Sequence, residues 1–296
     1  MVSLLPSATE IVFALGRGDE LVGVTFECDY PPEARQRRVV STSALPGGLS
    51  PREIDALVSE RIAAGEDLYR LDERALADLD AELLLTQDLC AVCAVDVDRV
   101  DDALRYLQCS AQVLTLDPRS LDEVLDSITT VGTALGVGPR ATAILAELRG
   151  RLDRLRTTVA DASPPRALVL EWTDPPFSAG HWVPDLVEAA GGQPVLAHPH
   201  EDSQRLTTDA VLNASADFVV IAPCGYHLDA AAALGRDFVD AGQTPAGADV
   251  WAVDADAFFV RPGPRIVDGA ELLAQILHPD RVGPPNPDRA RMLMGA

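Results

Sequence analysis

The sequence has few basic residues, and its apolar residues are divided into short runs. Its 296 residues include 24 Lys and Arg against 46 Asp and Glu, which gives a formal net charge of -22. A surface this acidic repels nucleic acid, so we expect no nucleic-acid partner. No apolar run reaches the roughly 18 residues of a membrane-spanning helix. We therefore expect a globular protein, and the chain is long enough for two modest cores.

Cysteine is also scarce, and the start of the chain carries no export signal. Five cysteines are an odd number and lack the spacing of a disulfide framework, which favours a reducing compartment. The first six residues contain neither a basic segment nor a cleavage site. We therefore expect a cytoplasmic location. If an export segment precedes this sequence, the expected location is instead the periplasm or the cell surface.

Catalytic motifs are missing as well. The sequence contains no glycine-rich phosphate loop, no serine nucleophile elbow and no HExxH pair. Acidic residues such as Glu27, Asp88 and Glu171 follow predicted strands and have the chemistry for acid–base work. Carboxylates in such places bind polar ligands more often than they catalyse. We therefore expect a protein without enzymatic activity that requires no cofactor.

A long helical pattern occupies the middle of the chain. Ser120 and Glu123 form a capping box, in which each side chain satisfies a backbone N–H at a helix start. Apolar residues then recur at helical spacing, are interrupted at residues 136–139 by Gly-Val-Gly-Pro, and resume as far as Leu155. The pattern predicts one long bent helix or two abutting helices.

Short apolar runs alternate with helical patterns on both sides of this helix, which favours mainly parallel sheets. The predicted fold is α/β: two α/β lobes, joined by the bridging helix, with a ligand cleft between them. We expect an N-terminal lobe over residues 1–118, the bridging helix over 119–160 and a C-terminal lobe over 161–280. Residues 281–296 are rich in Pro and Asp and are expected to form a loose tail.

Aromatic and polar residues gather where the predicted strands end. Aromatics are only 5% of the chain, so this concentration indicates a ligand surface, since ligands bind beyond the carboxyl ends of parallel strands. A broad aromatic wall with a few polar anchors suits a large flat ligand. The alternative is that Trp182 and Phe259 pack the lobe interface. The candidate ligand-binding residues are Glu27, Tyr30, Gln87, Asp88, Trp172, Phe177, His181, Trp182, Tyr226, Phe259 and Arg261.

Four cysteines also follow predicted strands: Cys28, Cys90, Cys93 and Cys224. The Cys90–Cys93 pair has the CxxC spacing of a redox pair. The four thiols, with His181, are alternatively soft ligands for zinc or another metal. A third interpretation is that they are unpaired thiols of the cleft or the core.

Two segments resemble a known family. Residues 2–11 read Val-Ser-Leu-Leu-Pro-Ser-Ala-Thr-Glu-Ile, and residues 21–25 read Leu-Val-Gly-Val-Thr. Both are similar to the opening of the helical-backbone substrate-binding proteins that serve ABC importers of vitamin B12, haem and iron siderophores. Residues 261–266, Arg-Pro-Gly-Pro-Arg-Ile, are similar to a segment of the B12-binding members.

The resemblance implies two lobes with limited hinge closure and a corrinoid or metal chelate as the ligand. It adds Asp256 to the candidate ligand-binding residues. Family members present one carboxylate per lobe to arginines of a membrane permease, and the candidates here are Asp98 or Asp101 and Asp209. We expect the chain to be monomeric.

Two functions follow from these patterns. The first is a binding protein for a cobalamin-like corrinoid or a related metal chelate that delivers its ligand to an ABC importer. The alternative is a cytosolic metal- or thiol-dependent enzyme or sensor that uses the cysteines and histidine of the predicted cleft.

Overall fold

The computed structural model of this chain describes residues 1–87 and 111–295. The chain divides into two compact units. Unit 1 comprises Met1–Pro118 with Asp126–Leu145, and unit 2 comprises Arg119–Leu125 with Ala146–Ala296. Among the described helices, none has both the length and the apolar character needed to span a membrane.

Unit 1 is built on a mainly parallel sheet with the strand order β4-β3-β2-β1-β5-β6. Among the described strands of this sheet, only the β3–β4 pair, at one edge, is antiparallel. The central strands are buried and apolar, as expected where helices cover both faces of a parallel sheet. The strands are β1 (Val2–Ser3), β2 (Gly23–Thr25), β3 (Arg38–Ser43), β4 (Tyr69–Leu71), β5 (Leu83–Thr86) and β6 (Gln112–Thr115).

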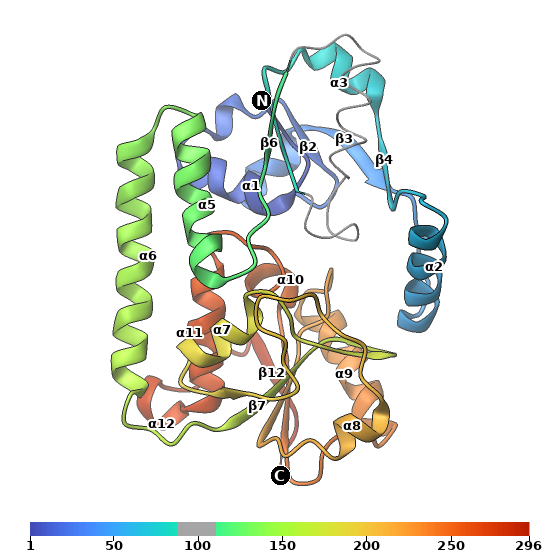
Figure 1. Cartoon of the computed structure of the whole chain (residues 1–296), viewed down its shortest axis with the longest axis vertical. Coiled ribbons are helices and arrows are strands. Elements are labelled where there is room, and N and C mark those ends of the chain that lie inside the picture. Colours follow the sequence, from blue (N-terminus) through green and yellow to red (C-terminus); the bar gives the residue numbers. More distant parts are fainter. Residues whose placement is uncertain (88–110, 296) are drawn as a thin grey trace. The chain divides into compact units, whose positions relative to one another are not determined.

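The helices of unit 1 begin with local signals in the sequence. Ser50 caps α2 through a capping box with Glu53, and Pro51 occupies the first helical position, where its missing N–H costs no hydrogen bond. Asp72 caps α3 by accepting from the backbone N–H of Ala75. The helices are α1 (Pro6–Ala14), α2 (Pro51–Ala63) and α3 (Glu73–Leu79), with short 3₁₀ helices at Gly18–Glu20 and Pro32–Gln36 (Figure 1).

The central helical pattern forms two helices, α5 (Leu121–Ala134) and α6 (Gly138–Val159), drawn in green in Figure 1. The chain reverses between them at Gly136, whose φ of +66° suits glycine. A Cβ atom on Gly132 would lie 2.4 Å from the Cβ atom of Ala141, so the two helices approach closely there. The segment is thus a helical hairpin at this point and not a bent rod.

Unit 2 is built on a second sheet, with the order β12-β11-β10-β7-β8 and with β9 paired to β7. β7, β10 and β11 are parallel, whereas β8 and β12 are antiparallel to their neighbours. The strands are β7 (Arg166–Thr173), β8 (Pro176–Ser178), β9 (Gln193–Pro194), β10 (Phe218–Ile221), β11 (Asp249–Val253) and β12 (Ala290–Met294).

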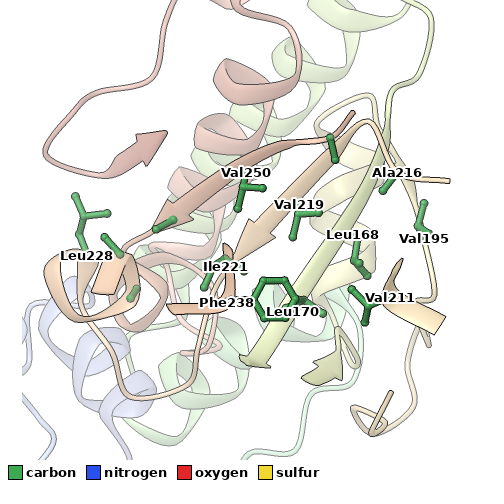
Figure 2. Close-up of a cluster of buried hydrophobic side chains, with 14 residues drawn as sticks. Leu168, Leu170, Val195, Val211, Ala216, Val219, Ile221, Leu228, Phe238 and Val250 are labelled. Atoms are coloured by element: carbon green, nitrogen blue, oxygen red, sulfur yellow. The ribbon is translucent and has the colours of Figure 1, made fainter. Parts of the chain in front are cut away.

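One buried cluster of unit 2 lies on one face of this sheet. Figure 2 shows Leu168 and Leu170 on β7, with Val219 and Ile221 on β10, at the alternating positions that share one face of a strand. Phe238 of α9 packs against them. The helices of unit 2 are α7 (Val183–Ala189), α8 (Thr208–Leu212), α9 (Leu228–Asp240), α10 (Ala255–Phe258), α11 (Ile266–Leu277) and α12 (Pro279–Val282).

The end of the chain is more ordered than its composition indicates. Residues 290–294, expected to belong to a loose tail, form β12 at the edge of the sheet. Leu293 packs so closely on α9 that a Cβ atom on Gly235 would lie 2.3 Å from it. The expectation was wrong here because the short apolar run Met292–Met294 follows the Pro- and Asp-rich residues and pairs with β11.

Candidate functional site

The aromatic group of unit 2 begins where β7 and β10 end. These strands are paired in parallel, with Leu170 opposite Ile221, so the segments that follow them emerge at the same edge of the sheet. There the ring of Trp172 meets the edge of the Tyr226 ring, with 5.7 Å between the centroids and an interplanar angle of 61°. Burial raises the pKa of Tyr226, so its hydroxyl stays neutral at physiological pH.

A charged group follows β11, the next strand of the sheet. Asp254 caps α10 by accepting from the N–H of Ala257 at 3.1 Å. Two residues on, the carboxylate of Asp256 accepts a hydrogen bond from Nη2 of Arg261. The Arg261 side chain is only 7% exposed, so its charge is balanced inside the protein by Asp256. Arg261 therefore presents a paired guanidinium at this edge of the sheet.

Phe177 and Glu171 lie at the β7–β8 hairpin. The guanidinium of Arg205 lies over the Phe177 ring, 5.5 Å from its centroid, and the two residues also form a backbone bridge. The hydroxyl of Ser203 donates a hydrogen bond to the Glu171 carboxylate, and the N–H of Gly180 approaches it at 3.5 Å. The loop at 203–205 thus fixes both predicted residues.

His181 is held in an uncommon backbone conformation, with φ of +49°, just before α7. Its Nε2 atom lies 3.2 Å from the Asp202 carboxylate, and its ring packs on Trp182. Desolvation by burial lowers the pKa of His181, and the nearby Asp202 opposes that shift. The imidazole is therefore poised toward its neutral form.

Trp182 and Phe259 were predicted as ligand-binding residues, with packing as the alternative. The structure buries both within unit 2, with 6% of Trp182 and none of Phe259 exposed. Nε1 of Trp182 donates to the Phe259 carbonyl at 2.7 Å. In this structure their rings fill the interior of unit 2 and their polar atoms are used there. Ligand contact by these two residues stays a prediction.

In unit 1, the corresponding group follows β2. The hydroxyl of Tyr69 donates to the carboxylate of Glu27 at 3.2 Å, and the Phe26 ring lies 6.2 Å from the Tyr69 ring. Phe26 and Tyr30 are 41% and 44% exposed, whereas Gln87, at the end of β5, is buried. Unit 1 thus presents aromatic surface beyond its strand ends.

Residues 1–253 match the model of the family described as periplasmic binding protein. The chain belongs to the periplasmic binding protein family. That match spans the described strands from β1 to β11, so it covers the first sheet and all of the second except β12.

Relatives of this periplasmic binding protein agree over nearly its whole length. It is 28% identical over 286 residues to a cobalamin-binding protein of Halobacterium salinarum, covering 94% of this chain and 69% of the relative. It is 26% identical over 290 residues to an uncharacterized ABC transporter substrate-binding lipoprotein of Bacillus subtilis, covering 95% and 80%. The crystal structure of the periplasmic vitamin B12 binding protein of Vibrio cholerae has a TM-score of 0.62 at 24% identity, covering 93% of this chain and 95% of that one. This likeness shows the same two-lobed α/β fold.

These findings correct one expectation. The predicted cytoplasmic location is wrong: the family is that of periplasmic binding proteins, and the Bacillus subtilis relative is a lipoprotein. Both point to a place outside the cytoplasm. The odd number of cysteines misled the prediction, because unpaired thiols indicate a reducing compartment only weakly.

The predicted thiol cluster is described only in part. Cys28 of unit 1 is buried, with Sγ 3.0 Å from the hydroxyl oxygen of Thr9. Cys224 of unit 2 is partly exposed, and its backbone N–H donates to the Glu171 carbonyl at 3.2 Å. The other predicted positions, Asp88, Cys90, Cys93, Asp98 and Asp101, lie outside the described residues.

Several residues at the strand ends of this family member were missed by the sequence analysis. They are Tyr69, Ser203, Arg205, His227 and Asp254. Asp254 carries a usable signal, since an acidic residue directly after a strand and before a helix is a frequent N-cap. Ser203 and Arg205 carry none, because only tertiary structure brings their loop beside β7 and β8.

Proposed function

We propose that this protein binds a cobalamin-like corrinoid, or a related flat metal chelate, outside the cytoplasm and delivers it to an ABC permease. The family and the Halobacterium salinarum relative, which is named a cobalamin-binding protein, support this proposal. The predicted monomer would carry one ligand per chain.

The Trp172–Tyr226 pair carries the proposal most directly. It lies at the carboxyl ends of parallel strands, where α/β proteins bind their ligands. Its rings offer apolar area to a macrocycle, and the neutral Tyr226 hydroxyl can donate to or accept from an amide side chain. The paired Asp256 and Arg261 add polar groups beside it.

The remaining ligand contacts are proposals from the same logic. In unit 1 the exposed ring of Tyr30 and the carboxylate of Glu27 offer an apolar and a polar contact. In unit 2, Phe177 with its stacked arginine extends the aromatic surface. A zinc or other metal ion at the cleft cysteines stays a prediction that rests on the spacing of Cys90 and Cys93.

For permease docking we propose Asp209 as the carboxylate of unit 2. It lies in the first turn of α8 and its side chain is exposed. An exposed carboxylate at a helix start is free to meet an arginine of a membrane protein in a charge-assisted hydrogen bond. Its proposed counterpart is Asp98.

The test is a titration of purified protein with cyanocobalamin, cobinamide and haemin, followed by absorbance and tryptophan fluorescence. We expect saturable quenching at one ligand per chain for at least one of these chelates. Trp172→Phe should remove most of the quenching, whereas the matched variant Trp251→Phe, on strand β11, should retain it. Absence of binding by all three at about tens of micromolar overturns the proposal.

The alternative of a metal- or thiol-dependent enzyme has less support. Matched family members are binding proteins, and the thiol of Cys28 faces the hydroxyl of Thr9 in a buried position rather than a reactive one. Metal analysis of untagged protein separates the two readings. A stoichiometric metal that Cys90→Ser removes would revive the alternative.

A further inference from the structure

The imidazole of His227 lies between two carboxylates that belong to the next strand end. Its Nδ1 atom is 3.0 Å from Oδ1 of Asp254, within hydrogen-bond distance, and its Nε2 atom is 3.6 Å from Oδ2 of Asp256, which is an ion-pair distance and too long for a hydrogen bond. His227 directly follows Tyr226, the residue whose ring meets Trp172. One side chain therefore joins the segment after β10 to the segment after β11.

Both carboxylates are fixed by other bonds. Asp254 also caps α10 through the N–H of Ala257, and Asp256 also accepts from the nearly buried Arg261. An imidazole that is hydrogen-bonded to one anchored carboxylate and lies beside a second has a more defined position than one that contacts only mobile surface carboxylates. The link at His227 is therefore more rigid than its 55% side-chain exposure alone would indicate.

The backbone beside Tyr226 needs such a link. The segment after β10 is bonded to its neighbours through the N–H of Cys224 and the carbonyl of Tyr226, at 3.2 Å each. Between them Gly225 has φ of +78°, and nothing lies within 4 Å of the position of its absent Cβ atom. Glycine at an open position leaves the chain freedom to pivot. The backbone bonds thus place the segment, and the first side chain after Tyr226 is the imidazole of His227.

We propose that His227 is a positioning residue, which holds Tyr226 edge-on to Trp172 by tying the end of β10 to Asp254 and Asp256. For ligand binding this rests on the proposed function, since it makes His227 a determinant of affinity that need not touch the ligand. Ordering an aromatic pair before binding removes an entropic cost from the binding step. Loss of the link should therefore weaken chelate binding about tenfold.

Three variants separate the two halves of the link. His227→Ala removes both contacts, His227→Asn keeps a donor near the position of Nδ1 for Asp254, and His227→Gln keeps one near the position of Nε2 for Asp256. His200→Ala is the matched control. The His200 side chain is likewise 55% exposed, and it too contacts an aspartate, with Nε2 3.1 Å from Oδ1 of Asp185.

The first readout is the near-ultraviolet circular dichroism of the ligand-free protein, which reports the Trp172–Tyr226 geometry and is identified by its loss in Trp172→Phe. The second is the affinity for the chelate that the wild-type protein binds. We expect His227→Ala to lose the near-ultraviolet dichroism of the pair and to bind the chelate more weakly. His227→Asn should restore most of the dichroism and the affinity, and His200→Ala should keep the wild-type values of each. All variants should unfold thermally near the wild-type temperature.

The proposal is overturned if His227→Ala keeps the wild-type dichroism and affinity, or if His200→Ala loses as much. It is also overturned if His227→Asn and His227→Gln both behave as His227→Ala, because the link would then not depend on a retained donor. If the wild-type protein binds no chelate, the proposed function fails. The dichroism of the variants then decides the positioning role without a ligand.

Discussion

The two strand-end groups use their aromatic residues in opposite ways. Unit 1 exposes Phe26 and Tyr30 to the extent of 41% and 44%, beside the Glu27–Tyr69 hydrogen bond. Unit 2 buries Phe259 fully and holds Trp172 against Tyr226. The residues beyond the carboxyl ends of the parallel strands thus form an exposed aromatic surface in unit 1 and a group of contacting rings in unit 2.

This difference bears on what binding would cost at each group if the proposed ligand contacts it. Interlocked rings that rest on a packed interior are ordered before a ligand arrives, so binding to them loses little entropy. Exposed rings adapt to a ligand but lose side-chain freedom when they meet it. Under the proposed function, the group of unit 2 would be ordered before the ligand arrives, and contacts from unit 1 would cost more to order. Variants in each unit should separate effects on stability from effects on affinity.

The largest effect is expected for Trp182→Ala in unit 2. The substitution removes a buried indole and its hydrogen bond to the Phe259 carbonyl, so the free energy of unfolding should fall by about 3–5 kcal/mol. Urea unfolding followed by far-ultraviolet circular dichroism measures the loss.

Trp182→Phe is the control for that variant. It retains most of the buried area but removes the indole N–H, so about 1–2 kcal/mol of the loss should remain. If Trp182→Ala unfolds at the urea concentration of the wild type, the interior of unit 2 does not depend on this ring, and the contrast between the units fails.

A smaller effect, of the opposite kind, is expected for Tyr30→Ala in unit 1. Because the ring is 44% exposed, its loss should change the free energy of unfolding by no more than about 0.5 kcal/mol. If the ring contacts the ligand, chelate affinity should fall by about 1 kcal/mol, or roughly fivefold, in a fluorescence titration.

Val22→Ala serves as the comparison for Tyr30→Ala. Val22 is 40% exposed and precedes β2, so it lies at the opposite end of that strand from Tyr30. It should change neither stability nor affinity. Equal losses of affinity in the two variants would mean that the exposed aromatics of unit 1 have no special part in binding.

Much of the fold was predictable because the signals are local. Leu83–Leu85 forms a buried strand, Ser50 and Pro51 begin a helix, and Gly136 ends one, each through chemistry contained in a few residues. The reversal after Gly136 was not predictable from periodicity, since a helical pattern interrupted by glycine fits a bend and a hairpin equally well. The close contact of Gly132 with Ala141 identifies the hairpin, and that contact is seen only in the structure.

The sequence predicted where the candidate site residues lie along the sheet, but not which way their side chains point or what they contact. Strand ends pointed to Trp172 and Tyr226, whose rings meet in unit 2, and to Arg261, which pairs with Asp256 near the Tyr226 carbonyl. The same rule could not tell that Trp182 points inward, because the direction of a side chain depends on the packing of α7. Nor could it find Arg205, which reaches Phe177 from a loop 28 residues later in the chain.

The smallest expected effect is a dependence of stability on pH that belongs to unit 2. All five histidines follow residue 180, so unit 1 contains none. Burial lowers the pKa of His181 in the folded protein, so the unfolded chain takes up this proton at a higher pH than the folded one. The contribution of His181 to stability is therefore fully present above its ordinary pKa of about 6.5 and is lost as the pH falls through the lowered folded value.

His181→Asn should remove that loss while keeping a polar side chain near Asp202. The variant should lose less stability than the wild type between about pH 7.5 and pH 5.5, measured as the shift in the urea midpoint. The difference should be a fraction of the Trp182→Ala effect, because Asp202 opposes the pKa shift. If the urea midpoints of the two proteins shift equally with pH, the pKa of His181 is the same in the folded and the unfolded chain. The acid sensitivity of unit 2 would then arise from its carboxylates, a property that it shares with unit 1.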